Sequence, residues 1–273
     1  MARLPVTTGG LARCRPGFRP GPMWRNPMSD RALARNKFGR PAQEHRMRAA
    51  MDLMRHIPVC APRRIADVYE ERGSMRALLA CRFPHAEIEG FDLSRPNEGG
   101  QDAGGGRLGA EHQFDLLCLN GAGTSLRRLL PMLVGMVSAG GCLAVEFPND
   151  LYEPNRALMR MIAADGPWAK TLVPIAKTRP FNETMEGLYA LLIPICAAVD
   201  IWEATYLHAM ASITAIVEWM EATRLAPFLS VLDEVDRRKF LDRYAAELNE
   251  AYPALPNGGV LLRSRQLFVL AQP

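Results

Sequence analysis

The chain has 273 residues, 48% of them hydrophobic, which is enough to bury the core of one folded domain. No stretch approaches the roughly 18 uncharged apolar residues of a membrane span, so we expect a cytoplasmic protein without membrane contact. The formal net charge of +4 is unevenly placed, because residues 1–40 hold nine Lys or Arg and one Asp. The remainder is mildly acidic and lacks the basic face that nucleic-acid binding needs.

The six cysteines are scattered without a CxxC pair, and the five histidines are dispersed without an HExxH motif. This pattern predicts reduced thiols and no metal site.

Residues 1–28 are rich in Pro, Gly and Arg and have no apolar periodicity, which predicts a disordered basic extension. The segment imitates an organelle transit peptide, but a translation start at Met23 or Met28 explains it equally well.

Strands and helices alternate along the first half of the chain. An amphipathic helix over 42–56 ends before Pro58. The predicted strands cover 65–68, 88–91, 114–119 and 142–147, with helices over 74–82 and 125–136 and a turn at Gly140-Gly141 before the last strand. Strands joined by helical crossovers form a parallel sheet. Residues 93–112 contain six glycines and almost nothing apolar, which predicts a flexible excursion.

The second half contains more helix. The predicted helices cover 155–163, 185–196, 212–223 and 233–250, and the predicted strands cover 199–208, 260–263 and 266–271. The last two strands would flank a short turn. We therefore expect an α/β fold with an open, doubly wound, mostly parallel sheet ending in an antiparallel pair. One domain over 42–273 would carry helical insertions at 165–184 and 209–250, which could form a lid.

Several motifs occur in the order and spacing of one known family. They read VDIWEATYLHAM, IVEWMEATRLAPFL, FLDRYAAELNEAYP and GGVLLRSRQLFVLAQ, and upstream EHRMRAAMDLMRHIP and GGCLAVEFPNDLYEPNRALMR. Over residues 42–92 and 113–272 the chain resembles the trans-aconitate 2-methyltransferases. The resemblance implies a seven-stranded-type, Rossmann-like methyltransferase sheet, here lacking one strand-helix unit where the glycine-rich excursion stands. It also implies S-adenosylmethionine as cofactor and a carboxylate of trans-aconitate as methyl acceptor.

The resemblance identifies four candidate cofactor-binding residues. The segment IADVYEERG matches the family's glycine-rich VxDLGCGPG loop, in which Asp67 and Gly73 keep their places. Asp92 matches the acidic residue that binds the ribose hydroxyls, and Asn120 matches a position lining the cofactor. Both also fit a simpler interpretation, Asp92 as a capping residue and Asn120 as part of an Asn-Gly turn.

Two loop glycines of the family are replaced in this chain, by Tyr69 and Glu71. A tyrosine ring takes space near the donor, and residues other than glycine rarely adopt positive φ. A carboxylate also repels the methionine carboxylate of the cofactor. These changes predict weaker cofactor binding than an unaltered loop would give.

A polycarboxylate substrate needs cationic partners, and the planar fork of arginine suits a carboxylate. The family's TGLRPFL reads TRLAPFL here, which places Arg224 where glycine stood, and its FPRLF reads SRQLF, which places Arg265 one position before the family's arginine. Arg179, Arg224 and Arg265 are the candidate substrate ligands. Trp202 and Tyr206 would wall the pocket, although aromatic side chains at such spacing are more often core.

Two functions remain open from the sequence. The first is an S-adenosylmethionine-dependent O-methyltransferase, acting as a monomer on a small anionic substrate. No catalytic residue is assigned, because a carboxylate is already ionised and positioning is the main demand. The alternative is a catalytically inactive methyltransferase-like binding or regulatory protein.

Overall fold

A computed structural model describes residues 39–69, 75–93, 113–121, 126–177 and 184–273. The chain divides into two units, residues 1–36 and 37–273, and the described residues all belong to the second. The predicted disorder of residues 1–28 lies outside the described residues, as does the glycine-rich excursion from residue 94 onward. None of the helices in the described ranges is long and apolar enough to cross a membrane.

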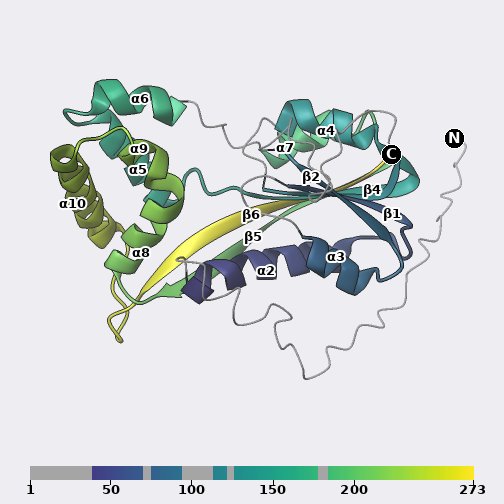
Figure 1. Cartoon of the computed structure of the whole chain (residues 1–273), viewed down its shortest axis with the longest axis horizontal. Helices are drawn as coiled ribbons and strands as arrows, with labels where there is room; N and C mark the ends of the chain where they lie inside the picture. The colour runs from purple at the N-terminus through teal and green to yellow at the C-terminus, as the bar shows by residue number, and fades with distance from the viewer. Residues whose placement is uncertain (1–38, 70–74, 94–112, 122–125, 178–183) are drawn as a thin grey trace, which may run out of the picture. The chain divides into compact units, whose positions relative to one another are not determined.

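The described residues form one six-stranded sheet in the order β2-β1-β3-β4-β6-β5 (Figure 1). The strands are β1 (Arg64–Tyr69), β2 (Glu87–Asp92), β3 (Phe114–Asn120), β4 (Val137–Pro148), β5 (Ala198–Met210) and β6 (Val260–Gln272). Strands β1 to β4 are parallel, whereas β6 runs antiparallel to both β4 and β5. The predicted α/β class with a mostly parallel sheet is confirmed, and the number of strands is one fewer than seven in the described part.

Helices cover both faces of the sheet because side chains alternate along each strand. On one face, here named the α2 face, α2 (Gly39–His56) and α3 (Arg76–Arg82) pack on a core that includes Ile65, Leu116 and Phe268. On the other, the α4 face, α4 (Leu126–Val134) and α7 (Met185–Leu192) pack on Ala66, Leu117 and Leu267.

The remaining helices of the described residues form a separate core, here named the helical core. They are α5 (Pro154–Ala164), α6 (Ala169–Lys177), α8 (Ile213–Met220), the π-helix η1 (Glu221–Leu225), α9 (Ala226–Leu229) and α10 (Glu234–Ala251). Trp168, Phe228 and Phe240 are buried in this core together with Val260 and Leu262 of β6. Full burial of one such large side chain stabilises the fold by roughly 1.5–3 kcal/mol. Strand β6 therefore contributes to the sheet and to the helical core.

The predicted turn between residues 263 and 266 was wrong, because β6 continues through it. It pairs with β5 from Val260↔Met210 to Gln272↔Ala198. Ser264 and Gln266 suggested a turn because they are polar, but their side chains are buried on the sheet. The predicted turn at Gly140-Gly141 lies instead at an irregularity within β4, where Gly140 has φ of 79°.

The predicted reduced state holds for four of the described cysteines, Cys81, Cys118, Cys142 and Cys196. Burial raises the pKa of the Cys142 thiol to about 12, so this thiol stays protonated and unreactive. The expectation was wrong for Cys60, which is disulfide-bonded. Cys60 lies exposed in the connection from α2 to β1, outside the apolar strands that shield the buried thiols.

Candidate functional site

The carboxyl ends of β2, β1 and β3 bring two of the predicted cofactor residues to one edge of the sheet. Tyr69 pairs with Asp92 on one side and with Asn120 on the other. Asn120 in turn pairs with Glu146 of β4. Ligands of open α/β sheets bind outside the carboxyl ends of the strands, so this edge is the candidate site.

Asp67 anchors the segment that follows β1. Its side chain is 1% exposed, and its Oδ1 accepts a hydrogen bond of 3.2 Å from the backbone NH of Met75, one residue before α3. Asp67 thus ties the end of β1 to the start of α3 and holds both ends of the connecting loop. Gly73 and Glu71 belong to that loop and lie outside the described residues.

Tyr69 folds back over the neighbouring strand. A Cβ placed on Gly90 would lie 3.7 Å from Cε1 of Tyr69 and 3.9 Å from its hydroxyl oxygen. The ring therefore rests on the bare backbone of β2, where the absence of a side chain leaves room for it. Burial raises the pKa of the Tyr69 phenol, as do the nearby carboxylates of Asp92 and Asp67. The phenol is neutral at physiological pH and adds no charge to the edge.

Buried polar side chains continue across the α2 face from this edge. We call them the polar row, and they are Asp67, Asn120, Glu146, Gln266 and Ser264. Glu146 is 2% exposed and Gln266 is 1% exposed, and the Nε2 of Gln266 donates to the Ser264 hydroxyl at 3.3 Å. Burying polar groups costs free energy unless they are hydrogen-bonded, so a row of them on an otherwise apolar face indicates a site.

Sequence reasoning assigned no role to Glu146 or Ser264. The available signal for Glu146 was a charged residue inside the apolar run CLAVEFP. Ser264 gave no such signal, because it lies in the run of four polar residues RSRQ, which lacks the alternation of a strand with one polar face.

Trp202 and Tyr206, the predicted aromatic wall, lie on the α2 face between β5 and α2. The Trp202 ring stacks on Phe268, with centroids 4.9 Å apart, and its centroid is 4.8 Å from that of His56 of α2. The Tyr206 hydroxyl donates to Oδ2 of Asp52 at 2.7 Å. Burial raises the pKa of Tyr206, and the bond to Asp52 raises it further. These aromatic side chains fasten α2 to the sheet beside the polar row.

Two of the three candidate arginines, Arg224 and Arg265, lie in the described residues, and they belong to different elements. Arg265 belongs to the alternating set of β6 that faces α4, so it lies on the face opposite Tyr206. Its Nε donates to Oε1 of Glu153 at 2.8 Å and its Nη1 to Oε1 of Glu203 at 3.2 Å. Arg224 lies in the π-helix η1, and Arg179 is outside the described residues.

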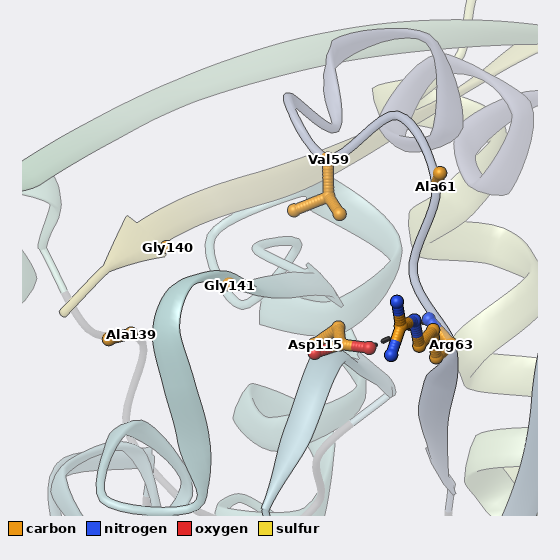
Figure 2. A pocket seen from close by; sticks show the side chains of 7 residues that line it. All are labelled: Val59, Ala61, Arg63, Asp115, Ala139, Gly140 and Gly141. Atoms are coloured by element: carbon orange, nitrogen blue, oxygen red, sulfur yellow. Dashed lines mark hydrogen bonds between the residues drawn. The ribbon is translucent and has the colours of Figure 1, made fainter.

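A cavity of about 270 Å³ opens at the opposite edge of the sheet (Figure 2). Its lining residues are Val59, Ala61, Arg63, Asp115, Ala139, Gly140 and Gly141. Burial alone would raise the pKa of Asp115, but hydrogen bonds from the backbone NH groups of Arg63 and Arg64 and from the Ser138 hydroxyl lower it. These groups lie at the amino ends of β1 and β3, away from the polar row.

Comparisons with known proteins agree with the motifs. No protein-family model matches the chain. The chain is 38% identical over 245 residues to a trans-aconitate 2-methyltransferase of Methylobacterium radiotolerans, covering 84% of this chain and 94% of that protein. It is 34% identical over 245 residues to one of Yersinia pseudotuberculosis, covering 85% and 95% of the two chains.

Solved structures give a more distant likeness. The YcgJ protein of Bacillus subtilis aligns with a TM-score of 0.47 and 11% identity, over 84% of this chain and 99% of its own. Phosphoethanolamine N-methyltransferase 2 of Haemonchus contortus aligns with a TM-score of 0.43 and 11% identity, over 84% and 52%. The identity to the curated relatives extends over almost their whole length. The chain therefore belongs to the trans-aconitate 2-methyltransferase family.

Proposed function

We propose that the protein transfers a methyl group from S-adenosylmethionine to a carboxylate of a small polycarboxylate such as trans-aconitate. The observation that carries the proposal is the alignment of Asp92, Tyr69 and Asn120 on one rung at the carboxyl edge of the sheet. Family membership supplies the reaction class, because the curated relatives are named for this activity. The protein acts as a monomer on free small molecules.

The residues at the edge fit the donor in two respects. Asp92 ends β2 and is only half-buried, so its carboxylate can accept hydrogen bonds from ribose hydroxyls. Tyr69 is the bulky replacement of a loop glycine, and its ring rests on Gly90. This position of the ring supports the proposal that the space beyond the end of β1 is left for the donor. Asp92, Asn120 and the segment anchored by Asp67 would hold the donor, with Gly73 from the loop.

When bound, S-adenosylmethionine supplies a methyl group on a cationic sulfur, which a carboxylate oxygen can take without losing a proton. No residue of this chain therefore needs to act as a base, and positioning the acceptor is the main task. The polar row offers hydrogen-bonding groups for that purpose from β4 and β6, namely Glu146, Gln266 and Ser264. Arg179 and Arg224 remain candidates for binding further carboxylates of the acceptor.

The direct test has two parts. Calorimetric titration of the full chain with S-adenosylmethionine and with S-adenosylhomocysteine measures donor binding. Incubation with S-adenosylmethionine and trans-aconitate, followed by mass spectrometry of the acid, measures methyl transfer. We expect saturable donor binding and a monomethyl ester. Boiled protein provides the control for the uncatalysed reaction.

The outcomes separate the two functions that the sequence left open. Donor binding with no ester from trans-aconitate or from a panel of di- and tricarboxylates would contradict the proposed reaction. Absence of donor binding at millimolar concentration would favour the inactive methyltransferase-like protein instead.

A further inference from the structure

One side of α2 faces β5 through residues spaced four apart. Arg48, Asp52 and His56 follow one another along this side, as i, i+4 residues do on a helix. His56 contacts Trp202, and Asp52 accepts the hydrogen bond from Tyr206. The guanidinium carbon of Arg48 lies 5.8 Å from the centroid of the Tyr206 ring. The helix and the strand therefore run side by side, with Arg48 at the amino-terminal end of the contact.

His208 extends this contact on the strand. It lies two residues beyond Tyr206, so its side chain is on the same α2 face, and its Nε2 atom is buried. Burial lowers the pKa of His208, and the positive charge of Arg48 lowers it further. Arg48 lies over the Tyr206 ring, and His208 is the next residue of β5 on the same face, so both adjoin Tyr206, whose pairing partner Ser264 ends the polar row on β6.

We propose that Arg48 and His208 together form the subsite for a carboxylate of the methyl acceptor, at the contact between α2 and β5. The proposal rests on the proposed function and names residues that determine acceptor specificity. The Arg48 side chain is exposed, so its planar fork is accessible to a carboxylate while its inner surface contacts the Tyr206 ring. An imidazole beside it adds a hydrogen-bond donor from the sheet.

The neighbouring carboxylates leave room for an anion here. Asp52 already accepts from the Tyr206 hydroxyl at 2.7 Å and from Nη1 of Arg55 at 2.9 Å, so its charge is largely satisfied within the protein. Glu146 lies on β4, with β6 between it and β5, and its charge contributes to the raised pKa of Tyr206 after burial and Asp52. His56 lies beside Trp202, four residues before Tyr206 on β5. Arg48 and His208 are the donors placed at Tyr206 itself, and we assign the external carboxylate to that pair.

The test uses direct binding of trans-aconitate to the full chain saturated with S-adenosylhomocysteine. Arg48→Gln should raise the dissociation constant of trans-aconitate about tenfold or more, since it removes the bidentate partner. Arg48→Lys should recover part of that loss because it keeps the charge but not the fork. His208→Gln should raise the constant less, because Gln keeps a donor. The affinity for S-adenosylhomocysteine should stay within about twofold of the unmodified protein in all three variants.

Matched controls come from exposed residues elsewhere. Arg238→Gln on α10 and His85→Gln in the α3–β2 connection make the same chemical changes at exposed positions and should leave both affinities unchanged. Unaltered trans-aconitate binding in Arg48→Gln and His208→Gln would overturn the subsite while leaving the proposed function intact. If the unmodified protein binds the donor product but not trans-aconitate, the acceptor of the proposed function is wrong, and the subsite falls with it. Should Arg48→Gln fail to fold, Arg48→Lys and His208→Gln decide the matter by the same readout.

Discussion

Asp92 and Asn120 sit on the same rung of the sheet but differ in exposure. Asp92 is half-buried at the end of β2, whereas Asn120 is buried at the end of β3. A half-buried carboxylate can exchange water for ribose hydroxyls at little cost, while a buried amide is held in one orientation by its surroundings. Asp92 is therefore the residue whose alteration should affect donor affinity most directly.

We expect Asp92→Asn to weaken binding of S-adenosylhomocysteine by about ten- to a hundredfold, the range of one or two hydrogen bonds to a charged group. The substitution keeps the shape but leaves only one acceptor oxygen. Isothermal titration calorimetry measures the change. Asp200→Asn, at an exposed position of β5, makes the same change away from the edge and should have no effect. Equal affinities in both variants would remove Asp92 from the donor site.

Gly90 matters because the Tyr69 ring rests on it. A Cβ at Gly90 would be at ordinary contact distance from the ring, so Gly90→Ala should leave donor affinity unchanged. The branched side chain of Gly90→Val would displace the ring toward the donor, and we expect at least tenfold weaker binding. Adding Tyr69→Ala to Gly90→Val should restore binding, which a double-mutant cycle measures. If the two substitutions prove additive, the ring does not depend on Gly90.

Single residues also show the limit of sequence reasoning. The motif comparison treated Arg265 as a substitute for an arginine one position later. In a strand, a shift of one residue moves a side chain to the other face, and here Arg265 faces Glu153 and Glu203 while Gln266 faces the polar row. The motif comparison identifies the residue type, but the face of the sheet on which the side chain lies depends on the pairing along the whole strand.

At the scale of elements, α2 is held to β5 by a polar bond inside an aromatic contact. Tyr206 and Asp52 are separated by 154 residues in the chain, and their hydrogen bond of 2.7 Å joins the first described helix to the sheet edge. The contact also fixes where Arg48 lies, because Arg48 and Asp52 share one side of α2. Stability and acceptor binding thus depend on the same helix.

We expect Tyr206→Phe to lower the free energy of unfolding by about 1–2 kcal/mol, because the Asp52 carboxylate loses a donor in a partly buried place. Urea unfolding followed by circular dichroism measures the change. Tyr152→Phe, at a position 71% exposed, serves as the matched control and should change stability by less than about 0.5 kcal/mol. A loss no larger than that of the control would show that the bond does not stabilise α2.

Most elements could be predicted because strands and helices alternate with clear periodicity, and β1, β2 and β3 agree with their predictions to within one residue at each end. The end of the chain could not be predicted in the same way. Ser264, Arg265 and Gln266 form a polar run that is typical of a turn, yet the thirteen-residue β6 passes through it. Only the long-range pairing with β4 and β5 distinguishes a polar strand face from a turn.

At the scale of the whole molecule, the proposed donor site and the hydrogen bonds of Asp115 lie at two opposite edges of the sheet, the carboxyl and the amino ends of the parallel strands. Asp92 and Asn120 end β2 and β3 at the first, where Asn120 pairs with Glu146 of β4. At the second, Asp115 joins β1 to β3 and β4 through hydrogen bonds from Arg63, Arg64 and Ser138. Substitution at the second edge should therefore alter stability without altering ligand binding.

The hydrogen bonds keep the pKa of Asp115 below its usual value near 3.8 in the folded protein. A lowered folded pKa stabilises the protein fully above the unfolded pKa, and this stabilisation is lost as the pH falls through the folded value. We expect Asp115→Asn to be less stable than the unmodified protein at pH 7, with the difference shrinking below about pH 4. Chemical unfolding from pH 7 to pH 3 measures it. A difference that grows on acidification would contradict the assignment.

The ribbon made by β5 and β6 runs without interruption from the sheet into the helical core, where Val260 and Leu262 are buried. The sheet and the helical core cannot be separated by a cut in a linker, because such a cut would pass through the paired strands β5 and β6. Disturbing Phe240 or Tyr244 in the helices removes support from the ends of the same strands that carry Tyr206, His208 and Gln266. A substitution in the helical core therefore affects these distant side chains through the strand backbone and not through side-chain contacts.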